Sequence, residues 1–487
     1  MGGVLNITGQ AKPGQIRHGT MSASVQNSTP RDQQTTMAGT LMPECVRVDA
    51  LRIDHDLATL DRMLGSQIDA ILHHPAFQTL ESGWRGLKFL VDRTDFRQKV
   101  KIEVLDVPKE TLRQDFEDAP DLTQSGLFVQ TYTQEYDTPG AYPFAAIIAN
   151  YEFDAGAPDI AMLRSLSKVA AAAHMPFIGA VSPEFFGRAS MEEVTGIRDL
   201  PGYFERAAYL KWKAFRETED ARYVGLTLPR FLARLPYGPD TSPVRAFNYT
   251  EDVRGAGSRA FVWANAAFAF AVNLVRSFVR NGWCLQIRGP RAGGMIPDLP
   301  VHLYDLDTSR LGKIATDALI PETREFEFAG LGLIALSYTS NHDYACFYSA
   351  HSTQKPAVFD TRDASANSRI NARLPYIFLL SRIAHYLKLI QRENIGTTKD
   401  RRLLELELNN WIKELVTEMK DAGDELQASH PLRDARVEVQ DIEDNPGFFR
   451  IALFIVPHFQ IEGMDVSLSL MSQMPRARHR DLPTSPT

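Results

Sequence analysis

The clearest fold signal lies in residues 145–181, whose sequence is AAIIANYEFDAGAPDIAMLRSLSKVAAAAHMPFIGAV. Two apolar runs, Ala145–Ala149 and Phe177–Val181, have the length and composition of buried strands. Between them, Asp159–His174 has the length and residue content of a helix. Upstream, Lys101–Val107 (KIEVLDV) adds a further strand. This alternation predicts an α/β fold of the mixed α+β type, with a mixed or parallel sheet covered by helices.

Two helices are predicted on the N-terminal side of this unit. Large apolar residues recur at helical spacing over residues 57–72 and, after Pro75, again over residues 77–91. Residues 1–46 are instead rich in Ser, Thr, Gln and Gly and contain few large apolar side chains. Such a segment buries too little apolar surface to offset the entropy of ordering, so we expect a flexible N-terminal arm.

After the N-terminal arm, the chain is expected to divide into three regions, the first of which contains the helices and strands described above. A large α/β domain is expected over residues 47–370, interrupted by a Pro-rich connector near 229–245. Residues 371–475 are predicted to form a pair of amphipathic helices followed by strands. The last strand, residues 464–471, alternates apolar and polar side chains, and residues 476–487 form a basic tail that we expect to be disordered.

Four apolar segments complete the predicted elements. Ala260–Val275 is expected to be a buried helix, because it is shorter than a bilayer span and contains two Asn residues. Trp283–Arg288 and Leu333–Tyr338 are predicted as buried strands, and Phe449–Val456 as an apolar strand near the C-terminus.

Composition narrows the classes of function. The 53 basic and 60 acidic residues give a formal charge of −7 without long runs of one sign, which argues against a nucleic-acid surface. Cys45, Cys284 and Cys346 are widely spaced, so neither a disulfide framework nor a CxxC metal site is indicated. The N-terminal sequence shows no secretory signal. We therefore expect a cytoplasmic protein without membrane insertion.

The strongest enzyme-like feature is the loop Gly289–Gly294 (GPRAGG), which follows a predicted strand. Its backbone amides and arginines are suited in principle to a phosphate. However, it lacks the Lys-Ser/Thr of a P-loop and the spacing of a dinucleotide fingerprint, and Pro297 and Pro300 follow where a helix should begin. A tight turn is the favoured interpretation, and a phosphate- or nucleotide-binding enzyme is the alternative. No residue is predicted to be catalytic or to bind a cofactor or metal.

Six irregular segments, in order along the chain, carry a resemblance over about residues 51–475. Their sequences are FQTLESGWRGLKFLV (77–91), ARYVGLTLPRFLARLPYGPDTSPV (221–244), FVRNGWCLQIRGPRAGG (278–294), SNHDYACFYSAHSTQKP (340–356), SRIAHYLKLIQRENIG (381–396) and PHFQIEGMDVSLSLMSQMP (457–475). Together they resemble the large subunit of the type VI secretion contractile sheath, the TssC/VipB family. A phage-like tail sheath protein is the second alternative.

The resemblance implies a phage-tail-sheath-like core, with mixed sheets flanked by helices and with extended terminal arms. It also implies a structural, non-enzymatic role: the chain pairs with a small sheath subunit, and the pairs polymerise around an inner tube of hexamers above a baseplate. Contraction then propels the tube and its spike into a target cell. An AAA+ unfoldase recycles sheaths of this family through an N-terminal segment of the large subunit. The first 43 residues here show no clear amphipathic helix, so this element is altered, displaced or absent.

The same resemblance indicates candidate interface residues. The family links neighbouring subunits by exchanged terminal strands, and the matching strand here is residues 464–471. Weaker candidates lie on the helix over residues 77–91 and in the glycine-rich loop. The full set is Met464, Asp465, Val466, Ser467, Leu468, Ser469, Leu470, Met471, Trp84, Arg85, Arg288, Gly289, Arg291, Gly293 and Gly294.

Overall fold

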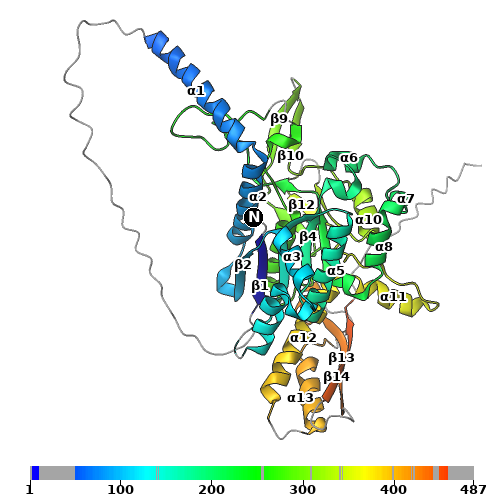
Figure 1. The fold of residues 1–487 in the computed structure, drawn as a ribbon. Coiled ribbons are helices and arrows are strands. Elements are labelled where there is room, and N and C mark those ends of the chain that lie inside the picture. The colour runs from blue at the N-terminus through cyan, green and yellow to red at the C-terminus, as the bar shows by residue number, and fades with distance from the viewer. Residues whose placement is uncertain are drawn as a thin grey trace, which may run out of the picture.

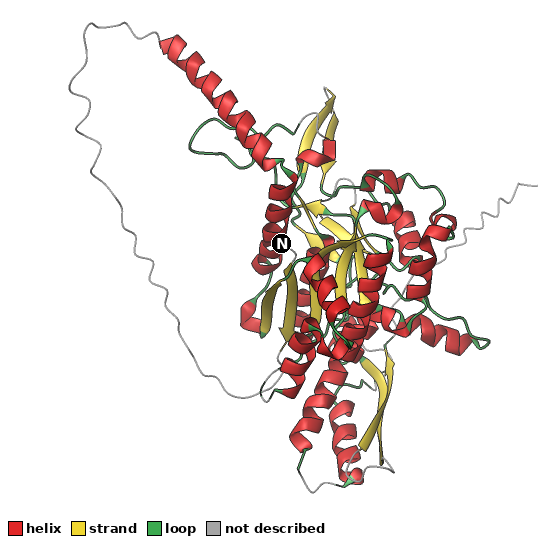
Figure 2. Ribbon diagram, in the orientation of Figure 1, coloured by secondary structure: helices red, strands yellow, loops and turns green. Residues whose placement is uncertain are grey.

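The computed structural model describes residues 3–9 and 50–458, apart from positions 139, 141, 254–256, 308–309, 339–341, 343, 397–399, 418, 420–422 and 442–448. Helices and strands mix throughout this part of the chain (Figure 2). No described helix is long and apolar enough to cross a membrane.

An eight-stranded sheet forms the centre of the fold (Figure 1). Its strand order is β2-β1-β3-β4-β5-β11-β12-β8. The pairs β3–β4, β4–β5 and β5–β11 are parallel, whereas β1 and β2 at one edge and β12 and β8 at the other pair antiparallel. The predicted mixed sheet is therefore confirmed. The strands are β1 (Gly3–Gly9), β2 (Val100–Asp106), β3 (Ala146–Phe153), β4 (Phe177–Val181), β5 (Val224–Leu228), β8 (Met295–Pro297), β11 (Ile334–Tyr338) and β12 (Tyr344–Phe347).

The N-terminal strand β1 is inserted between β2 and β3 and pairs antiparallel with both. The sequence prediction of a flexible arm over residues 1–46 misses this strand. Backbone amides and carbonyls of β1 pair with β2 along Gly3–Gly9 and with β3 along Val4–Ile7. This stabilisation comes from strands far away in the sequence and not from the composition of the segment. Local composition therefore gives no signal for it.

The remaining strand predictions divide into confirmed and wrong ones. Strands β2, β4 and β11 lie where the sequence places them, and β3 continues four residues beyond the predicted Ala149, as far as Phe153. Trp283–Arg288 is not a strand. Its backbone bonds instead to a side chain of the preceding helix: Ser277 Oγ donates to Trp283 O at 2.7 Å and accepts from Gln286 N at 3.1 Å.

Helices pack on both faces of the sheet and create two separate cores. On one face, α5 (Ala157–Ala172) and α8 (Leu210–Arg216) pack with Phe153 and Phe177. On the other, α2 (Pro75–Asp92) and α9 (Ala266–Asn281) pack with Ile148 and Ile178. The alternation of side chains along each strand explains why Phe177 and the adjacent Ile178 belong to different cores.

Helix α9 is buried along most of its length, as its composition predicts, but it begins at Ala266 rather than Ala260. Asn265 determines the start, because its side-chain oxygen accepts from Ala267 N at 2.8 Å. The Asn265 amide also donates to Tyr151 O at 3.3 Å, which ties the cap to β3. This polar residue therefore positions the helix instead of interrupting it.

The C-terminal part of the described chain has its own core. Helices α12 (Leu374–Asn394) and α13 (Arg401–Lys413) pack against the antiparallel pair β13 (Leu432–Asp441) and β14 (Phe449–Pro457). The predicted strand Phe449–Val456 is confirmed, whereas β13 was not predicted. Residues Ala435–Gln440 of β13 alternate apolar and polar side chains, which is the pattern of a half-buried strand, so the signal was present in the sequence and was overlooked.

The remaining described α-helices and strands complete the fold. They are α1 (Ala50–Leu72), α3 (Lys109–Asp118), α4 (Gly126–Phe128), α6 (Met191–Thr195), α7 (Leu200–Phe204), α10 (Glu322–Gly330), α11 (Arg362–Asn371), α14 (Asp424–Ser429), β6 (Phe231–Leu232), β7 (Trp263–Ala264), β9 (His302–Asp307) and β10 (Arg310–Ile314).

Candidate assembly surfaces

The predicted interlocking strand, residues 464–471, lies outside the described residues, so the structure does not place it. The nearest described strand is β14, which ends at Pro457. In the part of the chain that is described, β13 and β14 form a sheet of two strands. The outer edge of β13 is occupied, because Asn409 bonds to the backbone of Val437 and Thr417 N donates to Leu432 O. Among the described residues, the outer edge of β14 is therefore the one without a strand partner. Such edges are templates for pairing with a further strand.

Trp84 and Arg85 are neighbours on α2, but they have different surroundings. The Trp84 side chain is 63% exposed, so it is available for contact with another protein. Arg85 bonds within the chain, donating to Glu81 Oε1 at 2.6 Å and to the Tyr237 hydroxyl at 3.1 Å. Trp84 therefore remains a candidate contact residue, whereas the bonds of Arg85 give it an internal role.

Arg85 belongs to an ion-pair network that holds the Pro-rich connector against α2. Arg234, 7% exposed, donates to Glu81 at 2.7 Å and to Glu251 at 2.5 Å. Burial opposes the charge on Arg234, but the hydrogen bonds that it donates to Glu251 and Glu81 outweigh this effect and raise the pKa of the guanidinium. His73, at the end of α1, lies 3.2 Å from Glu251. Charged residues thus fix the junction between α1 and α2.

The loop from Arg288 to Gly294 is a closed turn, as the sequence favours. Gly289 N donates to Phe347 O at 2.7 Å, Gly294 N donates to Gly289 O at 2.8 Å, and Phe347 N donates to Gly294 O at 2.9 Å. The two glycine amides that would have to face a phosphate are therefore used within the fold. Arg288 is buried and Arg291 is exposed.

Glycine is required at position 293 by its conformation and by its neighbours. Gly293 has a φ of +85°, and a Cβ atom there would lie 2.2 Å from Gln286 O. A Cβ on Gly294 would lie 2.3 Å from Phe347 O. These glycines therefore allow close approach of backbone to backbone rather than of backbone to ligand.

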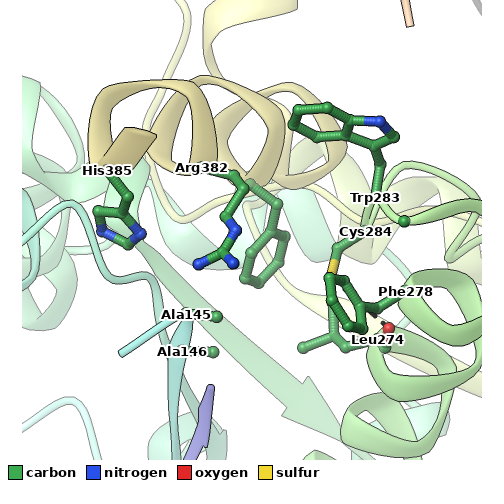
Figure 3. Close-up of a pocket in the computed structure, with 10 residues that line it drawn as sticks. Ala145, Ala146, Leu274, Phe278, Trp283, Cys284, Arg382 and His385 are labelled. Atoms are coloured by element: carbon green, nitrogen blue, oxygen red, sulfur yellow. Dashed lines mark hydrogen bonds between the residues drawn. The ribbon is translucent and has the colours of Figure 1, made fainter. Parts of the chain in front are cut away.

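Figure 3 shows a small cavity between α9, α12 and β3. Its volume is about 30 Å³, which suits a water molecule and is far below the several hundred Å³ of ligand sites. Burial raises the pKa of the Cys284 thiol to about 12 and lowers the pKa of His385 to about 3. Ala173 O also accepts a hydrogen bond from His385 Nε2 at 3.0 Å. Both groups are neutral near pH 7, so this pair provides no activated nucleophile.

The feature that the sequence interpretation missed is the exposure of α1. The apolar stripe over residues 57–72 predicted a helix, which the structure contains as α1, but the sequence did not indicate that no residue of this helix would be buried. Apolar periodicity identifies a face that needs a partner, without showing whether the same chain provides it.

The comparison with protein families settles what kind of chain this is. Residues 54–354 match the family model described as "EvpB/VC_A0108, tail sheath N-terminal domain". Residues 363–474 match the one described as "EvpB/VC_A0108, tail sheath gpW/gp25-like domain". The chain belongs to the VipB tail sheath family. The predicted phage-tail-sheath-like class is thereby confirmed, while the predicted domain limits remain predictions.

One curated VipB-family relative is the "Type VI secretion system sheath protein TssC1" of Pseudomonas aeruginosa. It is 42% identical over 435 residues, which cover 88% of this chain and 87% of the relative. This similarity supports the resemblance found in the six sequence segments.

Solved structures similar to this VipB-family chain come from contractile injection particles. The baseplate of the anti-feeding prophage contains a chain with a TM-score of 0.35 and 11% identity, covering 75% of this chain and 81% of that one. The contracted PVC sheath complex gives 0.35 and 8%, covering 63% and 68%. The contracted sheath of the anti-feeding prophage gives 0.32 and 11%, covering 63% and 66%. At these TM-scores the likeness adds no argument.

Proposed function

We propose that this chain is the large subunit of a type VI secretion contractile sheath. It pairs with a small sheath subunit, and the pairs polymerise around an inner tube of hexamers in the bacterial cytoplasm. Contraction of the polymer drives the tube and spike into a target cell. The observation that carries this proposal is the 42% identity, over 88% of the chain, to a protein named as a type VI sheath protein.

In this proposal the chain works through subunit packing and has no catalytic activity. Two structural features support that view. The Gly289–Gly294 loop bonds to itself and to Phe347, and the cavity beside His385 has a volume of only about 30 Å³. The baseplate is a further proposed partner, as is an AAA+ unfoldase that recycles the contracted sheath.

The proposed link between neighbouring subunits is the strand at residues 464–471. Strand β14 ends at Pro457, so only a few residues separate the β13–β14 pair from this segment. Pairing on the outer edge of a neighbour's β14 would form several backbone hydrogen bonds. Those bonds hold subunits together while other interfaces repack during contraction.

Co-expression with the small-subunit candidate, followed by electron microscopy, tests the proposed function. Hollow tubules with a cogwheel cross-section are expected from the pair and not from this chain alone. Tubules from this chain alone would instead indicate a phage-like tail sheath. A pair that stays dispersed under every assembly condition and binds a nucleotide saturably would contradict the proposal in favour of an enzyme.

A further inference from the structure

The loop between Thr353 and helix α11 exposes a run of apolar side chains. Val358 is 91% exposed and Phe359 is 53% exposed, and Ala357 beside them is exposed as well. Single exposed apolar residues are ordinary on protein surfaces, but several adjacent ones on one short loop mark a contact site. We name residues 356–359, with the sequence PAVF, the apolar loop.

Hydrogen bonds hold the apolar loop at both ends. Before it, Lys355 N donates to Arg216 O at 2.8 Å. After it, Phe359 N donates to Ser365 Oγ at 2.8 Å, and the Ser365 hydroxyl donates to Phe359 O at 2.9 Å. Ser365 itself is buried on α11. The exposed side chains therefore belong to a segment that is already held in place, which loses less conformational entropy when another segment binds it.

The middle of the apolar loop also has backbone groups available for pairing. Ala357 and Val358 lie outside any helix or strand, and within the described part of the chain neither takes part in a backbone hydrogen bond. Such groups can pair with a strand while the neighbouring side chains contact the apolar face of that strand. The fitting occupant is thus an extended segment with apolar residues at alternate positions.

The described chain ends close to α11. His458 O accepts from Tyr376 OH at 3.4 Å, and Tyr376 lies in the first turn of α12. Helix α11 directly precedes α12, and its Ile370 packs against the core that contains β13 and β14. In Figure 1, α11 extends outward near the upper end of β13. The chain beyond residue 458 therefore starts at the base of the helix that follows the apolar loop.

The next part of the chain is long enough to reach the apolar loop. Helix α11 has 10 residues, so at ~1.5 Å per residue it is about 15 Å long. Residues 459–463 span up to about 17 Å when extended. Residues 464–471 can thus begin beside the apolar loop, which lies at the start of α11, without unfolding any described element.

The chemistry of residues 464–471 suits this site. Their sequence, MDVSLSLM, alternates apolar and polar residues, so as a strand it has one apolar face. Residues 459–475 contain two acidic residues and no basic one, which gives a formal charge of −2. Residues 355–362 contain Lys355 and Arg362 against Asp360, which gives 2 − 1 = +1. The opposite signs favour contact between the two segments.

We propose that residues 464–471 pair with the apolar loop of the same chain while the subunit is free, and leave it when a neighbouring subunit binds them. The exposure of the loop and the position of residue 458 support the contact itself. Its role in assembly rests on the proposed function, in which the same segment links neighbouring subunits. The apolar loop then restrains assembly, because it covers a segment that would otherwise pair with any open sheet edge.

Disulfide trapping tests the contact in the full-length chain before assembly. Val358→Cys is combined in turn with Val466→Cys, Leu468→Cys or Leu470→Cys, in a chain that also carries Cys45→Ser. We expect at least one of these pairs to form a disulfide within one chain at least about tenfold faster than a control pair, because neighbouring segments of one chain have a high effective concentration.

The controls separate this contact from its alternatives. Leu303→Cys, at a 52% exposed position on β9, replaces Val358→Cys in the control pair, and equal rates would overturn the proposal. Faster trapping by Phe454→Cys on β14 would overturn it too, since the segment would then fold back on its own β14. Disulfides formed only between chains would assign the apolar loop to a second copy instead. Burial raises the pKa of the native Cys284 and Cys346 thiols to about 12, so they do not compete.

Assembly kinetics of the heterodimer test the restraint. Val358→Ser with Phe359→Ser should shorten the lag before tubules form at least about threefold, because a larger fraction of subunits then has the segment free. Val104→Ser with Leu303→Ser, at exposed positions of β2 and β9 away from α11 in Figure 1, is the matched control and should leave the lag unchanged. An unchanged or longer lag for the loop variant would overturn the proposal. If the heterodimer forms no tubules at all, the proposed function fails, whereas disulfide trapping in the dispersed chain still decides the contact.

Discussion

Glu325 is the residue at which burial most clearly changes the charge of a carboxyl group. It is fully buried on α10, and its Oε1 accepts from Ser349 N at 2.9 Å and from the Ser349 hydroxyl. Burial raises its pKa from 4.5 to about 7, although the bonds from Ser349 oppose the shift. Between these pH values the folded state binds more protons than the unfolded state, so stability from this group falls as pH rises.

Glu325→Gln should therefore gain in stability relative to the unsubstituted protein as pH rises from 5 to 8. A shift of this size corresponds to about 3 kcal/mol. Urea unfolding at several pH values measures the difference between the two proteins, which cancels the contribution of buried histidines. Glu322→Gln, at an exposed position of the same helix, is the control and should show a much smaller trend, because the Glu322 charge is a minor cause of the raised pKa of Glu325. A constant difference for Glu325→Gln across this range would contradict the assignment.

Gly293 tests whether the glycine-rich loop is a structural turn. Gly293→Ala combines a left-handed backbone with a Cβ only 2.2 Å from Gln286 O, so the backbone must shift. We expect a loss of about 2 to 4 kcal/mol in the free energy of unfolding. Gly282→Ala shares the positive φ but meets nothing within 4 Å, and should cost about 1 kcal/mol. Equal effects of both variants in urea unfolding would show that backbone crowding is unimportant.

At the scale of elements, the sequence alone predicts a helix or strand correctly where the residues of that segment determine its structure. The apolar run of β4 lies where it was predicted because the strand is buried on both faces and is therefore continuously apolar. Trp283–Arg288 looks the same in sequence, but Ser277 on α9 takes the backbone bonds that a neighbouring strand would provide. The formation of β1 likewise depends on the two strands that it pairs with, and the exposure of α1 depends on whether another part of the chain covers it. Neither can be inferred from the local sequence.

The contact between α2 and α9 depends on one small residue. A Cβ on Gly86 would lie 2.4 Å from the ring of Phe268, which is itself buried in the second core. Gly86→Ala should therefore force the helices apart and cost about 1 to 3 kcal/mol, measured by urea unfolding. Gly83→Ala is the control on the same helix, because its Cβ would meet only the end of the Asn150 side chain at 3.1 Å. A stabilising Gly86→Ala, as helix propensity alone predicts, would contradict this packing.

At the scale of the whole molecule, the described residues form a folded unit without the C-terminal segment. The sheet, its two helical layers and the pair β13–β14 all lie before residue 459. Removal of residues 464–487 should therefore leave the two cores and α1 intact. What the deletion removes is a segment of alternating apolar and polar residues that we propose to pair as a strand with a neighbouring subunit.

Under the proposed function, deletion of Met464–Thr487 is thus expected to keep the heterodimer and abolish tubules, because we propose that this segment links one heterodimer to the next and takes no part in pairing within a heterodimer. Co-purification measures the first and electron microscopy the second. Deletion of residues 476–487 alone is the matched control: it removes the basic tail but keeps residues 464–471, and tubules should persist. Intact tubules after the longer deletion would exclude strand exchange at this segment. Loss of the heterodimer would show that the segment binds the small subunit instead of linking neighbours.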